Sequence, residues 1–421
     1  MTDAATLHDK LHARLAQFAR FGGTPEGGVH RPEATEANRD ARRAFVEWLK
    51  AAGLEVRIDG IGNIFGLAAL AGPDAPWVMT GSHLDSQPYG GRLDGTYGVL
   101  ASTLAVETLV ARHGAQRPAA VNFAVVSWTN EEGARYQPSV LGSQAYAGVF
   151  DYGWALDRVD GDGVRLRDAL DAIGFLGTDM PAPRPAAFLE LHIECGPLLE
   201  RAGHRLGVFD RWWGCRKIEL RFLGIPAHTG PTPMAERRDA LVAAAELIGA
   251  VNALQHAFPD GALHCSVGRC AVKPNSPNVV PSEATLFVEL RSPDPGVIAD
   301  AHDRMQDAAR AAADRQQVAL EIRRDELRPA GRFSTDLQAL AYAVAEGLGQ
   351  SPMRLDTIAA HDAVPLARLC PSLVVATPSI GGICHAPDED TAPEDLNLGF
   401  DLLYGMLERV LSHGLDGARN L

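Results

Sequence analysis

The fold of this chain is decided by residues 77–99, which read WVMTGSHLDSQPYGGRLDGTYGV. The stretch opens with an apolar run typical of a buried strand, and a Gly-rich loop with His83, Asp85 and Asp94 follows. Residues 99–112 then have the pattern of a helix. A strand, a polar loop and a helix in this order predict a parallel α/β sheet, in which ligand sites lie at the carboxyl ends of the strands.

Three further apolar runs end in polar residues in the same way. Residues 121–127 lead into WTNEEG, residues 188–191 lead into HIECG, and residues 373–376 lead towards GGICH. Runs that are apolar throughout indicate parallel strands covered on both faces. We therefore expect four strands to deliver polar side chains to one edge of a sheet. Amphipathic helices are predicted for the N-terminal segment and for residues 38–52.

A second pattern begins near residue 212. Its predicted elements are a strand, a helix, two strands, a helix and a strand, at residues 217–222, 238–256, 263–272, 284–291, 295–315 and 318–323. This βαββαβ order is that of a ferredoxin-like unit. A chain of 421 residues also exceeds one ordinary core of about 250–300 residues. We expect a main domain of residues 1–211 and 330–421, interrupted by an inserted domain of residues 212–329.

Composition narrows the possible partners. Hydrophobic residues make up 46% and charged residues 22%, which is typical of a globular protein. The net charge of −14 would repel a phosphate backbone, so no nucleic-acid partner is expected. No apolar run approaches the roughly 18 residues of a membrane span, and the start MTDAATLHDKLHARL lacks a signal-peptide core. Six cysteines without a CxxC pair indicate reduced thiols, and we expect a soluble cytoplasmic protein.

The loop after the first strand has the residue types of a metal site. The imidazole of His83 and the carboxylates of Asp85 and Asp94 suit zinc, manganese, nickel or cobalt better than calcium. Asp85, two residues from His83, could orient that ring by accepting its second N–H. The alternative is a solvated loop with incidental acidic residues.

The other three strand ends add to this set. The adjacent carboxylates Glu131 and Glu132 could divide their roles, one binding metal and the other handling protons. Taken alone, such a doublet is more often a solvated pair or a helix N-terminus. His192 and His385 follow the remaining two strands. Together the four strands supply the side chains that two metal ions with a shared carboxylate require.

The motifs GSHLDS, GRLDG, TNEEGARY, LELHIECGP, PAHTGPTPM, PNSPNVVP, ELRS and GGICHAPDED resemble, in this order, those of the M20-type metallohydrolases called hydantoinase/carbamoylase amidases. That subfamily includes N-carbamoyl-L-amino acid hydrolases, β-ureidopropionases and allantoate amidohydrolases. The resemblance covers nearly the whole chain. It implies two divalent ions per subunit (zinc, manganese, cobalt or nickel), with ligands His83 and His192 on one ion, Glu132 and His385 on the other, and Asp94 bridging both.

The resemblance also implies roles in catalysis and substrate binding. Glu131 would be the general base, and His228 would reach the metal centre of a partner subunit in a homodimer to stabilise the oxyanion. The substrate-binding candidates are Asn278, Arg291, Gly382 and Cys195. Arg291 lies opposite the apolar stripe of its predicted strand, where it could grip a carboxylate in a bidentate manner. The alternative for Arg291 is an ordinary surface arginine paired with Glu289.

Three departures from the family pattern concern the substrate. Cys195 stands where the family usually has Gln, the usual SHSP reads CHAP with Cys384 before His385, and the segment around His361 and Asp362 reads DTIAAHDA. We predict hydrolysis of a linear amide or ureido C–N bond in a small carboxylate-bearing compound, either an N-carbamoyl-L-amino acid or allantoate. The alternatives are a deacylase or deaminase with the same metal site, a cysteine hydrolase using Cys195 or Cys384, and a non-catalytic binding protein.

Overall fold

The computed structural model describes residues 4–113, 119–178 and 183–417, which form two compact units. The larger unit comprises residues 1–210, 333–355 and 359–421, and the smaller unit comprises residues 211–332 and 356–358. The predicted inserted domain of residues 212–329 falls within the smaller unit. The short segment 356–358, predicted to lie in the main domain, belongs to the smaller unit instead.

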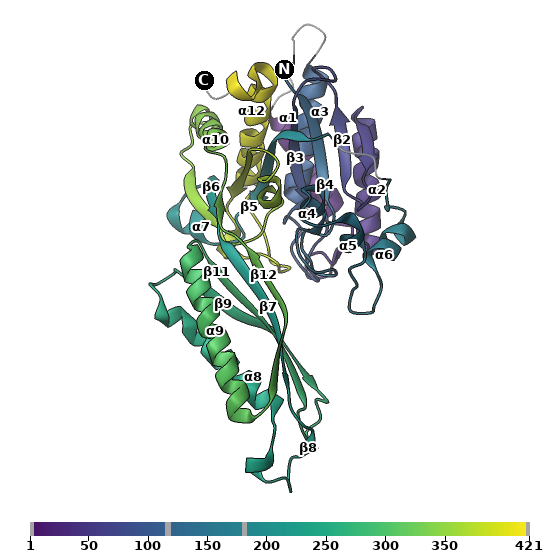
Figure 1. Cartoon of the computed structure of the whole chain (residues 1–421). Helices are drawn as coiled ribbons and strands as arrows, with labels where there is room; N and C mark the ends of the chain where they lie inside the picture. The colour runs from purple at the N-terminus through teal and green to yellow at the C-terminus, as the bar shows by residue number, and fades with distance from the viewer. Residues whose placement is uncertain (1–3, 114–118, 179–182, 418–421) are drawn as a thin grey trace. The chain divides into compact units, whose positions relative to one another are not determined.

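The larger unit is built on a central sheet with the strand order β1-β2-β4-β3-β5-β15-β6 (Figure 1). Strands β4 (Asn122–Trp128), β3 (Trp77–His83), β5 (Pro185–Ile193) and β15 (Ser372–Thr377) are parallel to one another. The flanking strands β2 (Ile64–Ala68) and β6 (Gly207–Trp212) pair antiparallel with this group, as β1 (Glu55–Ile58) does with β2. The sheet is therefore mainly parallel, as the apolar runs predicted.

Helices enclose the four parallel strands. Every residue of β4 and β15 is buried, which requires cover on both faces of the sheet. Helix α3 (Thr96–Arg112) packs on β3, β4 and β5, and α12 (Pro393–Gly417) packs against α3 and on β5 and β15. Figure 1 shows α12 in yellow beside α3, and α1 (Ala4–Phe18) packs against both. Leu7, Leu11, Leu15 and Phe18 of α1 are all buried, as their helical spacing predicted.

Further helices complete the larger unit. Helix α2 (Glu36–Ala51) packs on β1 and β2, α10 (Thr335–Gly347) packs on α12 and β15, and α11 (Ala363–Leu366) packs on β5 and β15. Strand β14 (Met353–Thr357) pairs with β6. The short elements are α4 (Leu141–Tyr146), α5 (Tyr152–Leu156), α6 (Leu166–Ile173), α7 (Leu198–Ala202) and the 3₁₀ turn η3 (Ile380–Gly382).

The smaller unit has the predicted βαββαβ order. Its elements are β7 (Gly214–Leu223), α8 (Ala240–Leu254), β9 (His264–Lys273), β11 (Glu283–Ser292), α9 (Pro295–Gln316) and β12 (Ala319–Arg328). The antiparallel sheet order β12-β7-β11-β9 places β7 and β11 in the centre. Short strands β8 (Ala227–His228) and β10 (Val279–Val280) pair separately, and β13 (Gly331–Arg332) pairs with the end of β6. The 3₁₀ turns are η1 (Met234–Glu236) and η2 (Gln255–Ala257).

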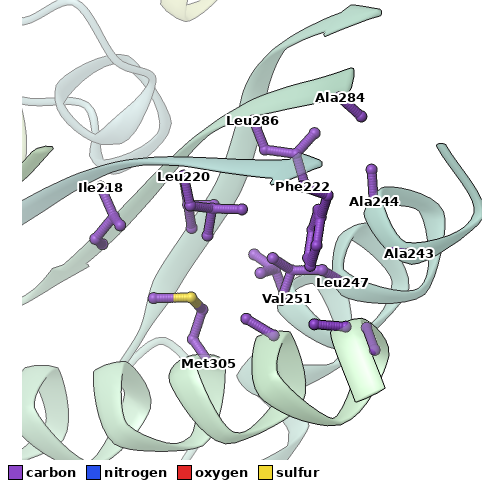
Figure 2. Close-up of a cluster of buried hydrophobic side chains, with 14 of the residues drawn as sticks. Ile218, Leu220, Phe222, Ala243, Ala244, Leu247, Val251, Ala284, Leu286 and Met305 are labelled. Carbon is purple, nitrogen blue, oxygen red and sulfur yellow. The ribbon is translucent and has the colours of Figure 1, made fainter. Parts of the chain in front are cut away.

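One face of this sheet packs against both helices. Figure 2 shows Leu220, Phe222 and Leu286 of the sheet directed at Leu247 of α8 and Met305 of α9. Small residues let the helices approach the strands closely, among them Ala243, Ala244, Ala301, Ala309 and Ala312. Along β11, buried and partly exposed residues alternate without exception, as expected for a sheet with one covered face.

One helical segment of the described residues, Ala240–Ala257, is long and apolar enough to cross a membrane by composition alone. A core helix of a globular domain passes the same test. In this segment Ala243, Ala244, Leu247 and Val251 form part of the core of the smaller unit. The buried face of this helical segment therefore packs against the sheet of the smaller unit.

Candidate metal centre

The two oxygens of Asp94 face two different groups of side chains. His192 Nε2 lies 3.1 Å and His83 Nε2 lies 3.6 Å from Asp94 Oδ1. On the other side, His385 Nε2 lies 3.0 Å from Asp94 Oδ2 and 3.3 Å from Glu132 Oε2. The fold thus brings the five residues predicted as ligands into one cluster, in which Glu132 contacts His385. The groups whose donor atoms all lie within 4.8 Å of one another are His83, Asp94 and His192 on one side, and Asp94, Cys384 and His385 on the other.

The spacing of these donor atoms suits metal coordination. Around one tetrahedral ion with bonds of about 2.0–2.2 Å, nitrogen and oxygen ligands lie about 3.3–3.6 Å apart. The distances from Asp94 to His83, His192 and His385 range from 3.0 to 3.6 Å. These distances are therefore compatible with coordination of divalent ions by the histidines and Asp94.

Glu131 lies beside this cluster. Its Oε2 is 3.6 Å from His83 Nε2, and its side chain is buried. Glu131 and Glu132 follow β4, and their backbone N–H groups both donate to the carboxylate of Asp85, at 3.1 and 3.2 Å. Gln87 in turn holds both oxygens of Glu132, through its backbone N–H at 3.0 Å and its side-chain amide at 2.9 Å.

Asp85 accepts the second N–H of His83 through its backbone and not through its carboxylate. His83 Nδ1 lies 3.0 Å from the backbone carbonyl of Asp85, whereas the nearest carboxylate oxygen of Asp85 is 3.7 Å away. The backbone carbonyl therefore accepts the ring N–H, and the carboxylate is used to hold Glu131 and Glu132 instead. His192 follows the same principle, because its Nδ1 lies 2.8 Å from the carbonyl of Ile193. Both rings present Nε2 to Asp94.

Glu389 joins two loops that carry ligands. Its Oε1 accepts the backbone N–H groups of Leu93 and Asp94, both at 3.0 Å, and its Oε2 accepts the N–H of His385 at 3.2 Å. Gly91 leaves the space that this carboxylate occupies, since a Cβ there would lie 1.9 Å from Glu389 Cδ. Sequence reasoning missed Glu389 because nothing in the run PDED distinguishes it from Asp388 and Asp390.

A second layer of buried acidic groups was also missed. Glu190 accepts the hydroxyl of Ser82 at 2.8 Å and the N–H of Ala363 at 2.9 Å. Asp362, fully buried, accepts the hydroxyl of Ser143. A carboxylate inside an apolar strand, as in FLELHI, is the signal that could have identified Glu190, because such a group is costly to bury without a function or a partner.

The site contains several buried acidic groups whose pKa values are shifted. Burial raises the pKa of Glu131 well above its usual range, and nearby Asp362 adds to this shift. Burial likewise raises the pKa of Asp85 and of Glu389 to about 7 in each case. Burial alone would raise the pKa of Asp94 too, but hydrogen bonds from the three histidines hold it well below the usual range. So many buried acidic groups fit a site built for divalent ions.

Cys195, Gly382 and Cys384 lie at the margin of the centre. Cys384 Sγ is 3.4 Å from Asp94 Oδ2, and the backbone N–H of Cys195 donates to the hydroxyl of Ser379 at 3.1 Å. Gly382 has φ of 69°, and a Cβ there would lie 2.7 Å from Pro197 Cβ. The loop before His385 therefore packs closely on the loop after β5, in the same region as the ligands.

The remaining predicted residues belong to the smaller unit. The pairing of β8 with β10 sets His228 opposite Val279, so that His228 and Asn278 are neighbours. His228 Nδ1 accepts the N–H of Gly230 at 3.0 Å, which leaves the proton of a neutral ring on Nε2. Arg291 lies on the face of β11 opposite the core and pairs with Glu289 and the carbonyl of Ile358. Its substrate-binding role stays a prediction.

Comparison with known proteins extends over both units. The chain matches peptidase family M20/M25/M40 over residues 79–409. It is 35% identical to an N-carbamoyl-L-amino-acid amidohydrolase of Rhizobium meliloti, with 94% of each chain covered. It is 33% identical to allantoate amidohydrolase of Bacillus subtilis, covering 92% of this chain and 95% of the relative. The crystal structure of a hydantoinase/carbamoylase family amidase from Burkholderia vietnamiensis superposes with a TM-score of 0.91 at 36% identity, covering 97% and 98% of the two chains.

Proposed function

This chain belongs to peptidase family M20/M25/M40, and from that premise we propose that it is a two-metal hydrolase of linear amide or ureido C–N bonds. The observation that carries the proposal is the position of Asp94 between two ligand groups, with His83 and His192 at one oxygen and His385 at the other. One carboxylate with this placement is suited to bridge two ions.

The side chains fit divalent metals by their chemistry. His83, His192 and Asp94 would hold one ion, and His385, Glu132 and Asp94 would hold the other. Imidazole and carboxylate ligands suit zinc, manganese, cobalt and nickel. When bound, such ions supply Lewis acidity that polarises a carbonyl and makes water a better nucleophile at neutral pH.

Glu131 is the residue best placed to move protons. It is buried beside His83, and Asp85 fixes its backbone N–H. Divalent cations nearby would lower its raised pKa and leave a carboxylate that accepts a proton from the attacking water. The same group can then pass that proton to the departing nitrogen, which must be protonated to leave as ammonia or an amine.

The substrate class follows from the relatives and from Arg291. The curated relatives include N-carbamoyl-L-amino-acid amidohydrolases and allantoate amidohydrolases, whose named substrates all carry a carboxylate beside a ureido group. A guanidinium can bind such a carboxylate through two parallel hydrogen bonds. We assign this role to Arg291, and we assign polar contacts with the substrate to Asn278 and the oxyanion contact to His228.

The proposal includes a homodimer. The sheet of the smaller unit ends in β9, whose outer edge has no partner strand within the described residues. Leu241 and Val242 of α8 are more than a third exposed. An open sheet edge and an apolar helix surface in one small unit are features that a two-fold interface between copies would cover.

A substrate panel tests the function. Purified protein loaded with manganese, cobalt, nickel or zinc would be assayed for ammonia release from N-carbamoyl-L-amino acids, their D-enantiomers and allantoate. N-formyl and N-acetyl amino acids in the same panel would be assayed for release of the free amino acid. We expect turnover of the ureido compounds and its loss with a chelator. Turnover of acyl compounds alone would favour the deacylase alternative, and loss of activity with a thiol alkylator but not with a chelator would favour a cysteine hydrolase.

A further inference from the structure

Cys384 places a sulfur atom among the donors of the second ligand group. Its Sγ lies 3.4 Å from Asp94 Oδ2, the same oxygen that lies 3.0 Å from His385 Nε2. The donor atoms of Asp94, Cys384 and His385 all lie within 4.8 Å of one another, close enough to hold a single ion. The roles assigned above leave this thiol without a function.

We propose that Cys384 is a thiolate ligand of the metal ion held by Asp94 and His385. In a tetrahedral site with a metal–sulfur bond near 2.3 Å, the sulfur lies about 3.5 Å from an oxygen or nitrogen ligand. The observed distance of 3.4 Å between Cys384 Sγ and Asp94 Oδ2 matches this spacing. On binding, the S–H bond breaks, the sulfur–metal bond forms, and the proton passes to solvent.

The neighbouring thiol provides a contrast. Cys195, on the loop after β5, is not part of the group whose donor atoms all lie within reach of one ion. His385 has φ of 58°, a left-handed conformation that is uncommon for residues other than glycine. This turn brings the side chains of two consecutive residues, Cys384 and His385, to the same carboxylate oxygen.

A thiolate ligand makes the two ions unequal. His83, His192 and Asp94 would offer an ion only nitrogen and oxygen donors, whereas Asp94, Cys384 and His385 would also offer it sulfur. Sulfur donors favour zinc, cadmium and cobalt over manganese and magnesium. The position at Cys384 and His385 should therefore bind softer cations than the position at His83 and His192. The active form would then contain zinc at both positions or two different ions.

Cobalt spectroscopy tests this inference, which rests on the proposed metal centre. A thiolate bound to Co²⁺ produces an intense near-ultraviolet charge-transfer band that nitrogen and oxygen ligands do not produce. We expect the band in the cobalt-loaded protein and in Cys195→Ser, and its loss in Cys384→Ser and Cys384→Ala. Bound cobalt would be counted in every sample, and circular dichroism would check that each variant is folded.

Metal competition provides a second measurement. The affinity for Cd²⁺ relative to Mn²⁺ should fall on the order of tenfold or more in Cys384→Ser and should change little in Cys195→Ser. If two cobalt ions bind and ureido substrates are hydrolysed but the wild-type protein has no charge-transfer band, the thiolate ligand is refuted while the proposed function stands. Failure to bind cobalt at all would refute the metal centre itself.

Discussion

The adjacent residues Glu131 and Glu132 show how neighbouring carboxylates acquire different roles. Glu132 faces His385 and is held on both oxygens by Gln87, as a metal ligand should be. Glu131 faces His83, and its carboxylate has no comparable clamp among the hydrogen bonds of the described residues. Two consecutive side chains therefore contact different histidines of the same site.

Replacing Glu131 separates proton transfer from metal binding. Glu131→Gln should keep both metal ions and lose about 10²- to 10⁴-fold in kcat, because the amide keeps the shape but cannot accept a proton. Glu132→Gln is the matched control and should lose metal together with activity. Metal content by elemental analysis and kcat on a ureido substrate check the pair. If Glu131→Gln loses metal and Glu132→Gln does not, the two roles are exchanged.

Arg291 tests the assignment of the substrate carboxylate. It already pairs with Glu289, and Lys217 lies 3.7 Å from the same acid, so Glu289 keeps a cation nearby when Arg291 is removed. Arg291→Ala should raise KM strongly for carboxylate substrates and leave their kcat less affected, whereas an amide analogue of the substrate should show little change. Arg291→Lys should recover only part of the loss. Equal effects on charged and uncharged analogues would mean that Arg291 is structural.

At the scale of elements, the site depends on loops that permit very close approach. Gly95 is the N-cap of α3 and has φ of 63°, and a Cβ there would lie 2.3 Å from the ring of His83. Gly91 makes room for Glu389 in the same loop. The glycines of this loop therefore leave room for the ring of His83 and for the carboxylate of Glu389.

A methyl group at Gly95 should displace His83. Gly95→Ala is expected to lower metal affinity on the order of 10- to 100-fold, the range seen when a ligand loses its support. Gly347→Ala at the end of α10 is the matched control, because among the described residues only the end of the Arg409 side chain, at 3.7 Å, lies within 4 Å of a Cβ at that position. That control should bind metal normally and change stability by less than about 1 kcal/mol. Calorimetric metal titration and thermal unfolding distinguish the two variants.

At the scale of the whole molecule, metal binding and stability should be linked through pH. In the metal-free protein the pKa of Asp85 rises from 3.8 to about 7, that of Glu389 from 4.5 to about 7, and that of His385 from 6.5 to about 9. Between about pH 4 and pH 9 these three groups therefore bind more protons in the folded state than in the unfolded state. The free energy of unfolding that they contribute falls as pH rises through this range.

Divalent ions should take the place of these protons. We expect the Tm of chelator-treated protein to fall between pH 6 and pH 9, while the Tm of metal-loaded protein changes less. The difference in Tm between the two forms should therefore grow with pH. Differential scanning calorimetry at pH 6, 7.5 and 9 measures it. If the difference in Tm between the two forms stays constant or shrinks as pH rises, divalent ions do not replace protons at these acidic groups.

A mixed dimer tests whether His228 acts across subunits. Homodimers of Glu131→Ala and of His228→Ala should each be nearly inactive. In a mixed dimer with shared sites, one site carries both defects and the other carries none. Random exchange of equal amounts makes half of the dimers mixed, so activity should recover to about a quarter of wild type under two-fold symmetry. If subunit exchange is demonstrated and no activity returns, His228 does not act on the partner's site.

The local pattern of the chain was enough to predict the architecture. Apolar runs located the four parallel strands, and the period of the helices and strands located the βαββαβ unit, because periodicity depends only on neighbouring residues. The candidate ligands could be named for a related reason. They follow strand ends, and the carboxyl ends of parallel strands meet at one edge of a sheet.

Only the tertiary structure decided how these residues are held and divided. The sequence suggested that Asp85 would orient His83, and only the structure shows that the backbone carbonyl of Asp85 does so while its carboxylate holds the loop of Glu131 and Glu132. The contact of Asp94 with Glu389 spans 295 residues of chain, and no local pattern encodes such a partner. The same holds for Cys384, whose distance from Asp94 depends on how two remote loops fold together.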